Sequence, residues 1–94
     1  MLNQVVVVGR IVNDLSIEEN RCNLVLGAIR SYKNTKGEYE TDFLDCELSK
    51  SLATNTVDYC RKGDLVGIKG HLEVKSNKMF ISVEKITFLT SKAE

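Results

Sequence analysis

The 94-residue sequence contains neither proline nor tryptophan, and its 13 basic and 13 acidic residues cancel. Without proline, every turn has to be formed by Gly, Asn, Asp or Ser. The balanced charge gives no argument for a polyanionic partner, so a nucleic-acid site would require local segregation of charge. Cys22, Cys46 and Cys60 fit neither a disulfide framework nor a zinc motif, which favours buried free thiols.

Long hydrophobic runs are also missing. The run at residues 5–8 has only four apolar residues and no basic region before it, unlike a signal peptide. No run approaches the roughly 20 residues of a membrane span. We therefore expect a cytoplasmic protein without a membrane partner. Its length predicts one domain over residues 1–90, followed by a frayed end at residues 91–94.

The clearest pattern spans residues 41–73 and predicts a strand, a helix, a turn and a second strand. Residues 41–49 alternate like a half-buried strand, with Leu44, Cys46 and Leu48 on one face and Phe43, Asp45 and Glu47 on the other. Residues 52–60 change to a helical period, and Gly63 is expected as the left-handed cap of that helix. Residues 65–74 form the next strand.

Three further segments complete the set of strands. Residues 3–12 are broken by Gly9, which predicts a bend that lets one strand serve both sheets of a small barrel. Residues 13–21 are polar and indicate a loop, while residues 22–31 and 79–89 alternate as strands. A short helix between the third and fourth of five strands is typical of the OB-fold. We therefore predict an all-β, five-stranded OB-fold barrel.

Two turns stand out by their basic residues. The segment YKNTKGEY at residues 32–39 is either a solvated hairpin tip or a flexible cationic finger with an aromatic residue at each base. The segment KSNK at residues 75–78 is a short turn between the last two strands.

The first strand predicts self-association. The four valines of residues 5–8 cannot all face one core. Apolar side chains on the outer face of a strand suggest that another subunit covers it. An isologous dimer that pairs two copies of this strand edge to edge would cap the exposed edge. We expect a homodimer or homotetramer whose interface includes Leu2, Gln4, Val6 and Val8.

Short segments along the chain resemble bacterial single-stranded DNA-binding proteins. They are LNQVVVVGRI at residues 2–11, TDF at 41–43, DYCRKGDLV at 58–66 and GHL at 70–72. Each segment is unspecific alone, but their order and spacing over residues 1–89 are specific together. The sequence ends at Glu94 without the acidic C-terminal tail of that family, so it resembles a short form.

This resemblance implies an OB-fold that binds single-stranded DNA during replication, recombination or repair, without catalysis and without a cofactor. Replication or recombination proteins are the other partners that it implies. Tyr32 and Phe43 fall where the family has base-stacking aromatic residues, and stacking accepts any base. The cations expected to contact phosphates are Arg10, Arg30, Lys33, Lys36, Lys50, Lys75 and Lys78. Tyr39 and Phe80 are further candidates, although Phe80 could equally cover an end of the barrel.

Other features differ from the family pattern. Ser49 and Asn77 stand at two further aromatic positions, and the turn at residues 75–78 replaces a long binding arm. Asp45 and Glu47 lie on the expected binding face, where they would repel phosphate. Two alternatives therefore stay open: a docking module similar to primosomal replication protein N, and single-stranded RNA binding.

The sequence offers no catalytic set. His71 has no second metal ligand at a useful spacing, so we expect it to be structural. Asp42 faces away from Asp45 and Glu47, which argues against an acidic metal site. There is no Ser/His/Asp or Cys/His arrangement and no phosphate-cradling glycine loop. We expect neither an enzyme nor a metal site.

Overall fold

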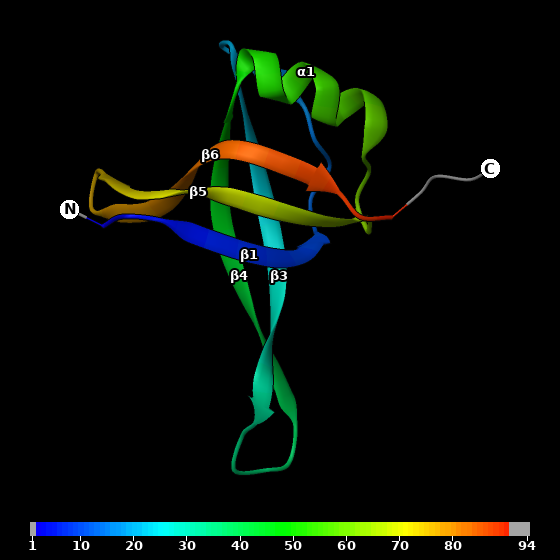
Figure 1. Cartoon of the computed structure of the whole chain (residues 1–94), viewed down its shortest axis with the longest axis vertical. Helices are drawn as coiled ribbons and strands as arrows, with labels where there is room; N and C mark the ends of the chain where they lie inside the picture. The colour runs from blue at the N-terminus through cyan, green and yellow to red at the C-terminus, as the bar shows by residue number, and fades with distance from the viewer. Residues whose placement is uncertain (1, 91–94) are drawn as a thin grey trace.

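The computed structural model describes residues 2–90, which form six strands and one helix (Figure 1). The predicted frayed end at residues 91–94 lies outside the described residues. The elements in chain order are β1 (Val5–Ile11), β2 (Ile17–Glu18), β3 (Arg21–Lys33), β4 (Tyr39–Ser49), α1 (Lys50–Tyr59), β5 (Leu65–Lys75) and β6 (Lys78–Phe88).

The strands close into a barrel. Their order is β1-β5-β6-β4-β3-β2, and β1 pairs additionally with β3. The β4–β6 pair is parallel through Cys46↔Ile81 and Glu47↔Ser82, whereas the other pairs are antiparallel. The five long strands, with α1 between the third and fourth of them, form the expected OB-fold barrel, and the sheet is mixed.

The predicted loop at residues 13–21 was wrong in part, because it contains the two-residue strand β2. Ile17 pairs with Cys22, and a tight hairpin turn at Glu19 and Asn20 joins β2 to β3. Both turn residues have positive φ, 51° and 65°. Such a turn is usually recognised in a sequence by Asn-Gly or Asp-Gly, and neither is present here. A two-residue strand is also too short to show an alternating pattern.

Alternating side chains of the strands fill the core. Cys46 and Leu48 of β4 are fully buried as predicted, and Leu44 is partly buried. The other fully or almost fully buried apolar residues include Ile11, Leu24, Leu26, Val66 and Ile68. All three cysteines are buried free thiols, as expected. Burial raises the pKa of the Cys46 thiol to about 12, so this group stays neutral in the core.

The helix α1 covers one end of the barrel and buries Ala53 and Thr56 (Figure 1). The prediction that Gly63 caps it was wrong. The helix ends at Cys60, which is extended (φ −126°, ψ 154°) and whose N–H donates to the carbonyl of Thr56. Gly63, at φ 98°, belongs instead to the following turn, where the N–H of Asp64 donates to the carbonyl of Arg61. The chain leaves the helix early because Cys60 enters the core.

No helix within residues 2–90 has the length and apolar character needed to cross a membrane.

Candidate nucleic-acid interface

Strands β3 and β4 continue beyond the barrel as a two-stranded arm (Figure 1). Their pairing shifts register between Ile29↔Thr41 and Lys33↔Tyr39. The predicted loop at residues 32–39 is therefore shorter, because its ends belong to the two strands. Asn34 organises the tip: its Oδ1 accepts hydrogen bonds from the N–H groups of Lys36 and Glu38, at 2.8 and 3.0 Å.

One face of the arm carries an ion-paired cluster formed by Arg30, Glu40 and Asp42. The Nε and Nη2 of Arg30 donate to the two carboxylate oxygens of Asp42 at 3.0 and 2.9 Å, and Nη1 donates to Glu40 at 2.9 Å. The Arg30 hydrogen bond lowers the pKa of Asp42, and Asp42 raises the pKa of Arg30. Arg30 was a predicted phosphate ligand, but its charge is already compensated within the arm.

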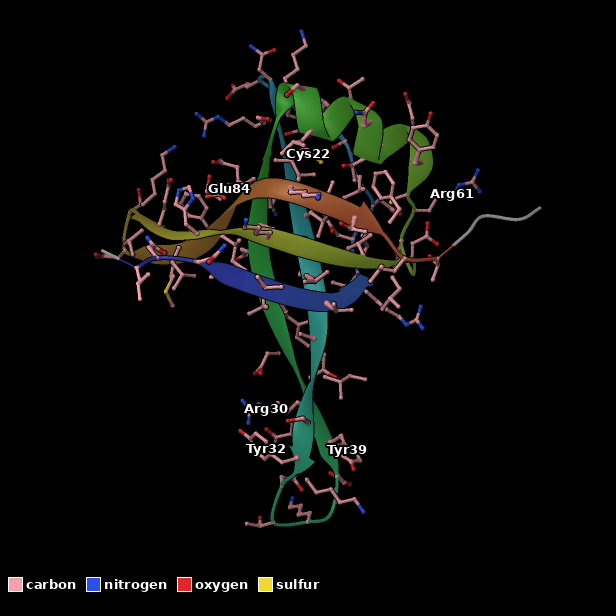
Figure 2. The ribbon with its side chains drawn as sticks, in the orientation of Figure 1. Cys22, Arg30, Tyr32, Tyr39, Arg61 and Glu84 are labelled. Carbon is pink, nitrogen blue, oxygen red and sulfur yellow. The ribbon has the colours of Figure 1, made fainter. Side chains whose placement is uncertain are left out.

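Three of the predicted aromatic residues are accessible. Tyr32, Tyr39 and Phe43 are 63%, 57% and 66% exposed. Figure 2 places Tyr32 on the same side of the arm as Arg30, and Tyr39 on the other side. The Nζ of Lys33 lies 5.8 Å from the centroid of the Tyr39 ring. The three rings are thus open to a ligand, although they do not share one face.

A groove of about 360 Å³ lies between the outer face of β4 and the β5–β6 turn. It brings together the predicted residues Lys75, Lys78 and Phe80 with the carboxylates of Asp45 and Glu47 on β4. The tight turn at Ser76 and Asn77, with φ of 53° and 63°, places Lys75 directly opposite Lys78. The groove is lined by Asn23, Asp45, Glu47, Lys75, Lys78, Met79 and Phe80.

Charge in this groove is mixed. Glu47 forms an ion pair with Arg21 at 2.8 Å, whereas the carboxylate of Asp45 makes no hydrogen bond or ion pair with another described residue. Lys75 and Lys78 likewise make no ion pair with a described residue. The groove therefore holds two lysine charges that no described ion pair compensates, together with the unpaired carboxylate of Asp45.

Two predicted cations lie apart from both the arm and the groove. Arg10 is at the end of β1, where its Nη1 donates to the carbonyl of Gly63 at 3.0 Å. Lys50 begins α1, at the opposite end of β4 from the arm (Figure 1). The structure does not bring Lys50 together with the aromatic side chains. Arg10, by contrast, pairs with Gly27, which pairs with Phe43, so Arg10 and Phe43 flank Gly27 on one face of the sheet.

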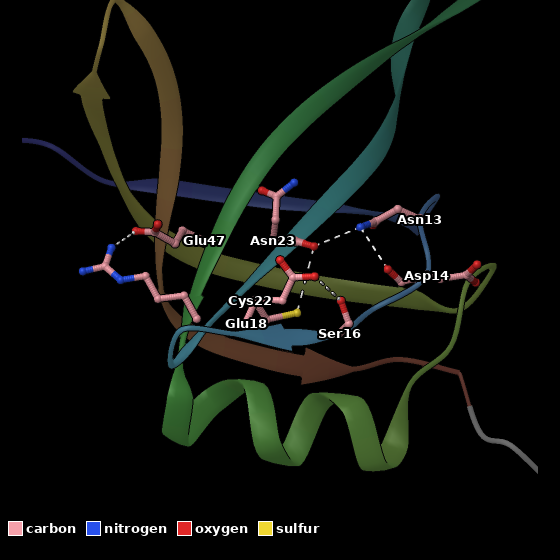
Figure 3. A pocket seen from close by; sticks show the side chains of 8 residues that line it. Asn13, Asp14, Ser16, Glu18, Cys22, Asn23 and Glu47 are labelled. Carbon is pink, nitrogen blue, oxygen red and sulfur yellow. Dashed lines mark hydrogen bonds and ion pairs between the residues drawn. The ribbon is translucent and has the colours of Figure 1, made fainter.

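A polar pocket of about 260 Å³ lies where β2 meets β3 (Figure 3). Asn13 anchors it: its Nδ2 donates to the carbonyl of Asn23 at 2.9 Å, and its Oδ1 accepts from the N–H of Val25 at 2.8 Å. Asn13 thus continues the pairing of β3 by side-chain hydrogen bonds, a role that no sequence pattern indicated. Within the part of the chain that the structure describes, no cluster of three His, Cys, Asp or Glu residues could hold a metal ion.

The predicted interface residues in β1 and directly before it are exposed. Leu2, Val6 and Val8 are 99%, 74% and 52% exposed, and Gln4 is exposed too. Residues 5–8 pair with β5 on one side, whereas β3 pairs only with Arg10 and Ile11. The other edge of residues 5–8 therefore lacks a strand partner among the described residues, so its backbone groups can pair with another chain.

His71 is not isolated, although the sequence shows no partner at a recognisable spacing. Its Nδ1 lies 2.7 Å from Oε2 of Glu84, and its Nε2 lies 2.6 Å from Oε2 of Glu73. An irregularity in the β5–β6 pairing, where Lys69 and Gly70 pair with Lys85 and Val83, leaves Glu84 as an extra residue that reaches the ring. The pKa of His71 is raised mainly by its hydrogen bond to Glu84 and secondly by its hydrogen bond to Glu73.

Comparisons with solved structures support the fold. Mitochondrial single-stranded DNA-binding protein Rim1 from S. cerevisiae matches with a TM-score of 0.76 and 17% identity, over 97% of this chain and 99% of that one. The N-terminal domain of the PriB protein from Thermoanaerobacter tencongensis matches with a TM-score of 0.71 and 19% identity, over 95% and 98%. At these identities the likeness concerns the architecture alone.

Sequence comparisons identify the family. Single-stranded DNA-binding protein B of Bacillus subtilis is 38% identical over 81% of this chain and 72% of its own length. Single-stranded DNA-binding protein 1 of Clostridium acetobutylicum is 32% identical over 99% and 98%. The model of the single-strand binding protein family matches residues 2–87, so the chain belongs to that family.

Proposed function

We propose that this protein binds single-stranded DNA without sequence preference. The family and the names of its relatives support this function. The observation that carries the proposal is Phe43, a large apolar ring that is 66% exposed on the outer face of β4. The ring lies over Gly27, where an added Cβ would meet its Cε1 at 3.6 Å, and most of its surface is accessible to an unpaired base. Every base has a π-face, so stacking on Phe43 requires no particular sequence.

Bases would stack on the rings while phosphates are held by lysines that form no ion pair with a described residue. Each stacked base contributes about 1–3 kcal/mol in truncation experiments on such proteins. Lys33 and Lys36 serve the arm, and Lys75 and Lys78 serve the groove. Because each neutralised phosphate releases counterions, log affinity falls with log salt at a slope of roughly −0.7 per contact. Duplex DNA is excluded because its bases are already stacked.

This binding requires no chemistry. The protein would protect or present displaced strands during replication, recombination or repair, as a non-catalytic protein. Binding is weakened by Asp45, whose unpaired carboxylate faces the groove.

We also propose that the protein forms a symmetric dimer through the open edge of β1. Two antiparallel copies of residues 5–8 would complete each other's backbone hydrogen bonds and cover Val6 and Val8. The sheet would then continue from one protomer into its partner.

The test is a titration with oligo(dT), followed by tyrosine fluorescence. Phe43→Ala and Tyr32→Ala are each expected to weaken binding severalfold, with circular dichroism reporting that the fold is intact. Tyr59→Ala is the matched control, because this equally exposed ring lies on α1 against Phe88 at 5.9 Å between centroids. Unchanged affinity in both test variants would remove the aromatic platform.

One alternative function has a specific observation in its favour. The unpaired Asp45 suits an OB-fold that docks on another replication protein rather than on DNA. That function is indicated if a gel shift with single-stranded DNA is negative at low salt while a pull-down recovers a replication protein. Competition between oligo(dT) and oligo(U) separates DNA from RNA binding, because RNA alone offers a 2′-hydroxyl group.

A further inference from the structure

A chain of side-chain hydrogen bonds runs along one face of the arm. It begins at Asp42, passes through Arg30 to Glu40, and reaches Asn34, whose Nδ2 donates to Oε2 of Glu40 at 3.0 Å. The Oδ1 of Asn34 then accepts from two N–H groups of the tip. The base of the arm is thereby connected to its tip without any apolar core.

The arm depends on such contacts, because an isolated two-stranded hairpin is only marginally stable in water. Backbone pairing is also interrupted there, between Ile29 and Lys33. Arg30 lies in this interrupted stretch and bridges to two residues of β4. Its guanidinium is planar, and its two parallel hydrogen bonds to Asp42 fix the angle between the strands better than a single contact would.

We propose that Arg30 is a positioning residue of the arm and that it does not bind phosphate. Its pairing with Asp42 and Glu40 holds β3 and β4 together where their register shifts, and so fixes the orientation of Tyr32 and Tyr39. This inference rests on the proposed function only for its effect on DNA. The cluster of one guanidinium and two carboxylates has a net charge of −1, which disfavours a phosphate on this face.

The two roles of Arg30 make opposite predictions for Asp42→Asn. A phosphate ligand would be released by this change, and binding to oligo(dT) would tighten. A positioning residue loses its partner, and binding weakens. We expect Arg30→Gln and Asp42→Asn to weaken binding alike, by about two- to fivefold, since exposed ion pairs are of modest strength. The slope of log affinity against log salt should not change in either variant.

Two further variants complete the experiment. Lys36→Gln removes a cation at the tip that forms no ion pair with a described residue, so it is expected to reduce the salt slope by about 0.7. The exchange Arg30→Asp with Asp42→Arg restores the pair between positions 30 and 42 with reversed polarity but loses the contact with Glu40, so it should recover part of the affinity. Tighter binding by Asp42→Asn, or a reduced salt slope in Arg30→Gln, would overturn the proposal.

A measurement without DNA tests the positioning role of Arg30 independently of the proposed DNA binding. Hydrogen exchange of the backbone amides of residues 31–41 should accelerate two- to fivefold in Arg30→Gln and Asp42→Asn. The expected factor is the same as for DNA binding, because the same ion pair is lost in both measurements. The reversed pair should restore part of the protection, because its contact with Glu40 is lost, and Lys36→Gln should leave protection unchanged. Equal exchange in all variants overturns the positioning role, whatever the DNA titration gives. If the unmodified protein does not bind oligo(dT) while hydrogen exchange is accelerated in the two variants, the proposed function is wrong and the positioning role of Arg30 stands.

Discussion

A Cβ atom on Gly9 would overlap the carbonyl oxygen of Gly27. Gly9 directly precedes Arg10, which pairs with Gly27 where β1 meets β3 and the barrel closes. Without side chains between them, the backbones approach closely enough for β1 to pair with β5 and β3 in turn. The bend predicted at Gly9 is therefore the point at which the barrel closes.

Gly9→Ala should destabilise the protein by about 1–3 kcal/mol, the usual cost of forcing atoms into a packed site. The matched control is Gly67→Ala. At Gly67 a Cβ would meet Leu89 at 3.6 Å and Val8 at 3.8 Å, which are ordinary contacts. Urea denaturation of the two variants measures the difference. Equal stability losses would contradict the close approach of β1 and β3.

His71 should titrate above its ordinary pKa of about 6.5, because Glu84 and Glu73 stabilise its charged form. Since the folded pKa is raised, the stabilisation is fully present below the unfolded pKa and is lost as pH rises through the folded pKa. The protein has a single histidine, so its ring signal in an NMR titration is unambiguous. Glu84→Gln should move the pKa back down, whereas Glu38→Gln on the arm should not. A His71 pKa at or below its ordinary value would contradict the two hydrogen bonds.

If the proposed dimer forms through β1, Val6→Lys should lower the mass of the assembly in solution. A lysine on an edge strand is a common natural device against strand pairing, and Val6 is 74% exposed on the outer face of β1. Light scattering after gel filtration should report the monomer for this variant. Val74→Lys is the control, because Val74 is comparably exposed at 68% but lies near the β5–β6 turn. The same mass for both variants and the unmodified protein would argue against the β1 interface.

Local periodicity was enough to predict the barrel. The alternation around Leu44, Cys46 and Leu48 and the helical stretch after it depend on neighbours in the sequence, and they are confirmed. The side-chain pairs between strands could not be predicted from local periodicity. The pairing of Arg30 with Asp42 depends on the β3–β4 register, and that of His71 with Glu84 depends on the extra residue in β6. The phosphate role predicted for Arg30 relied on its charge alone, which could not reveal two carboxylates on the opposite strand.

Asp45 is the position where a small change should improve binding. Its carboxylate lies in the groove with Lys75 and Lys78 and makes no hydrogen bond or ion pair with another described residue. Because like charges repel in a groove that a phosphate chain enters, Asp45→Asn should tighten oligo(dT) binding by about two- to fivefold at low salt, a typical effect of one exposed charge.

Asp58→Asn makes the same chemical change on α1, away from the groove, and should leave oligo(dT) affinity unaltered. The gain from Asp45→Asn should shrink as salt is added, since screening removes a repulsion between exposed charges. Tightening that persists at high salt would point to a hydrogen bond from the new amide instead. No tightening at any salt concentration would mean that the DNA strand does not enter the groove between β4 and the β5–β6 turn. The binding surface would then be confined to Phe43 and the arm.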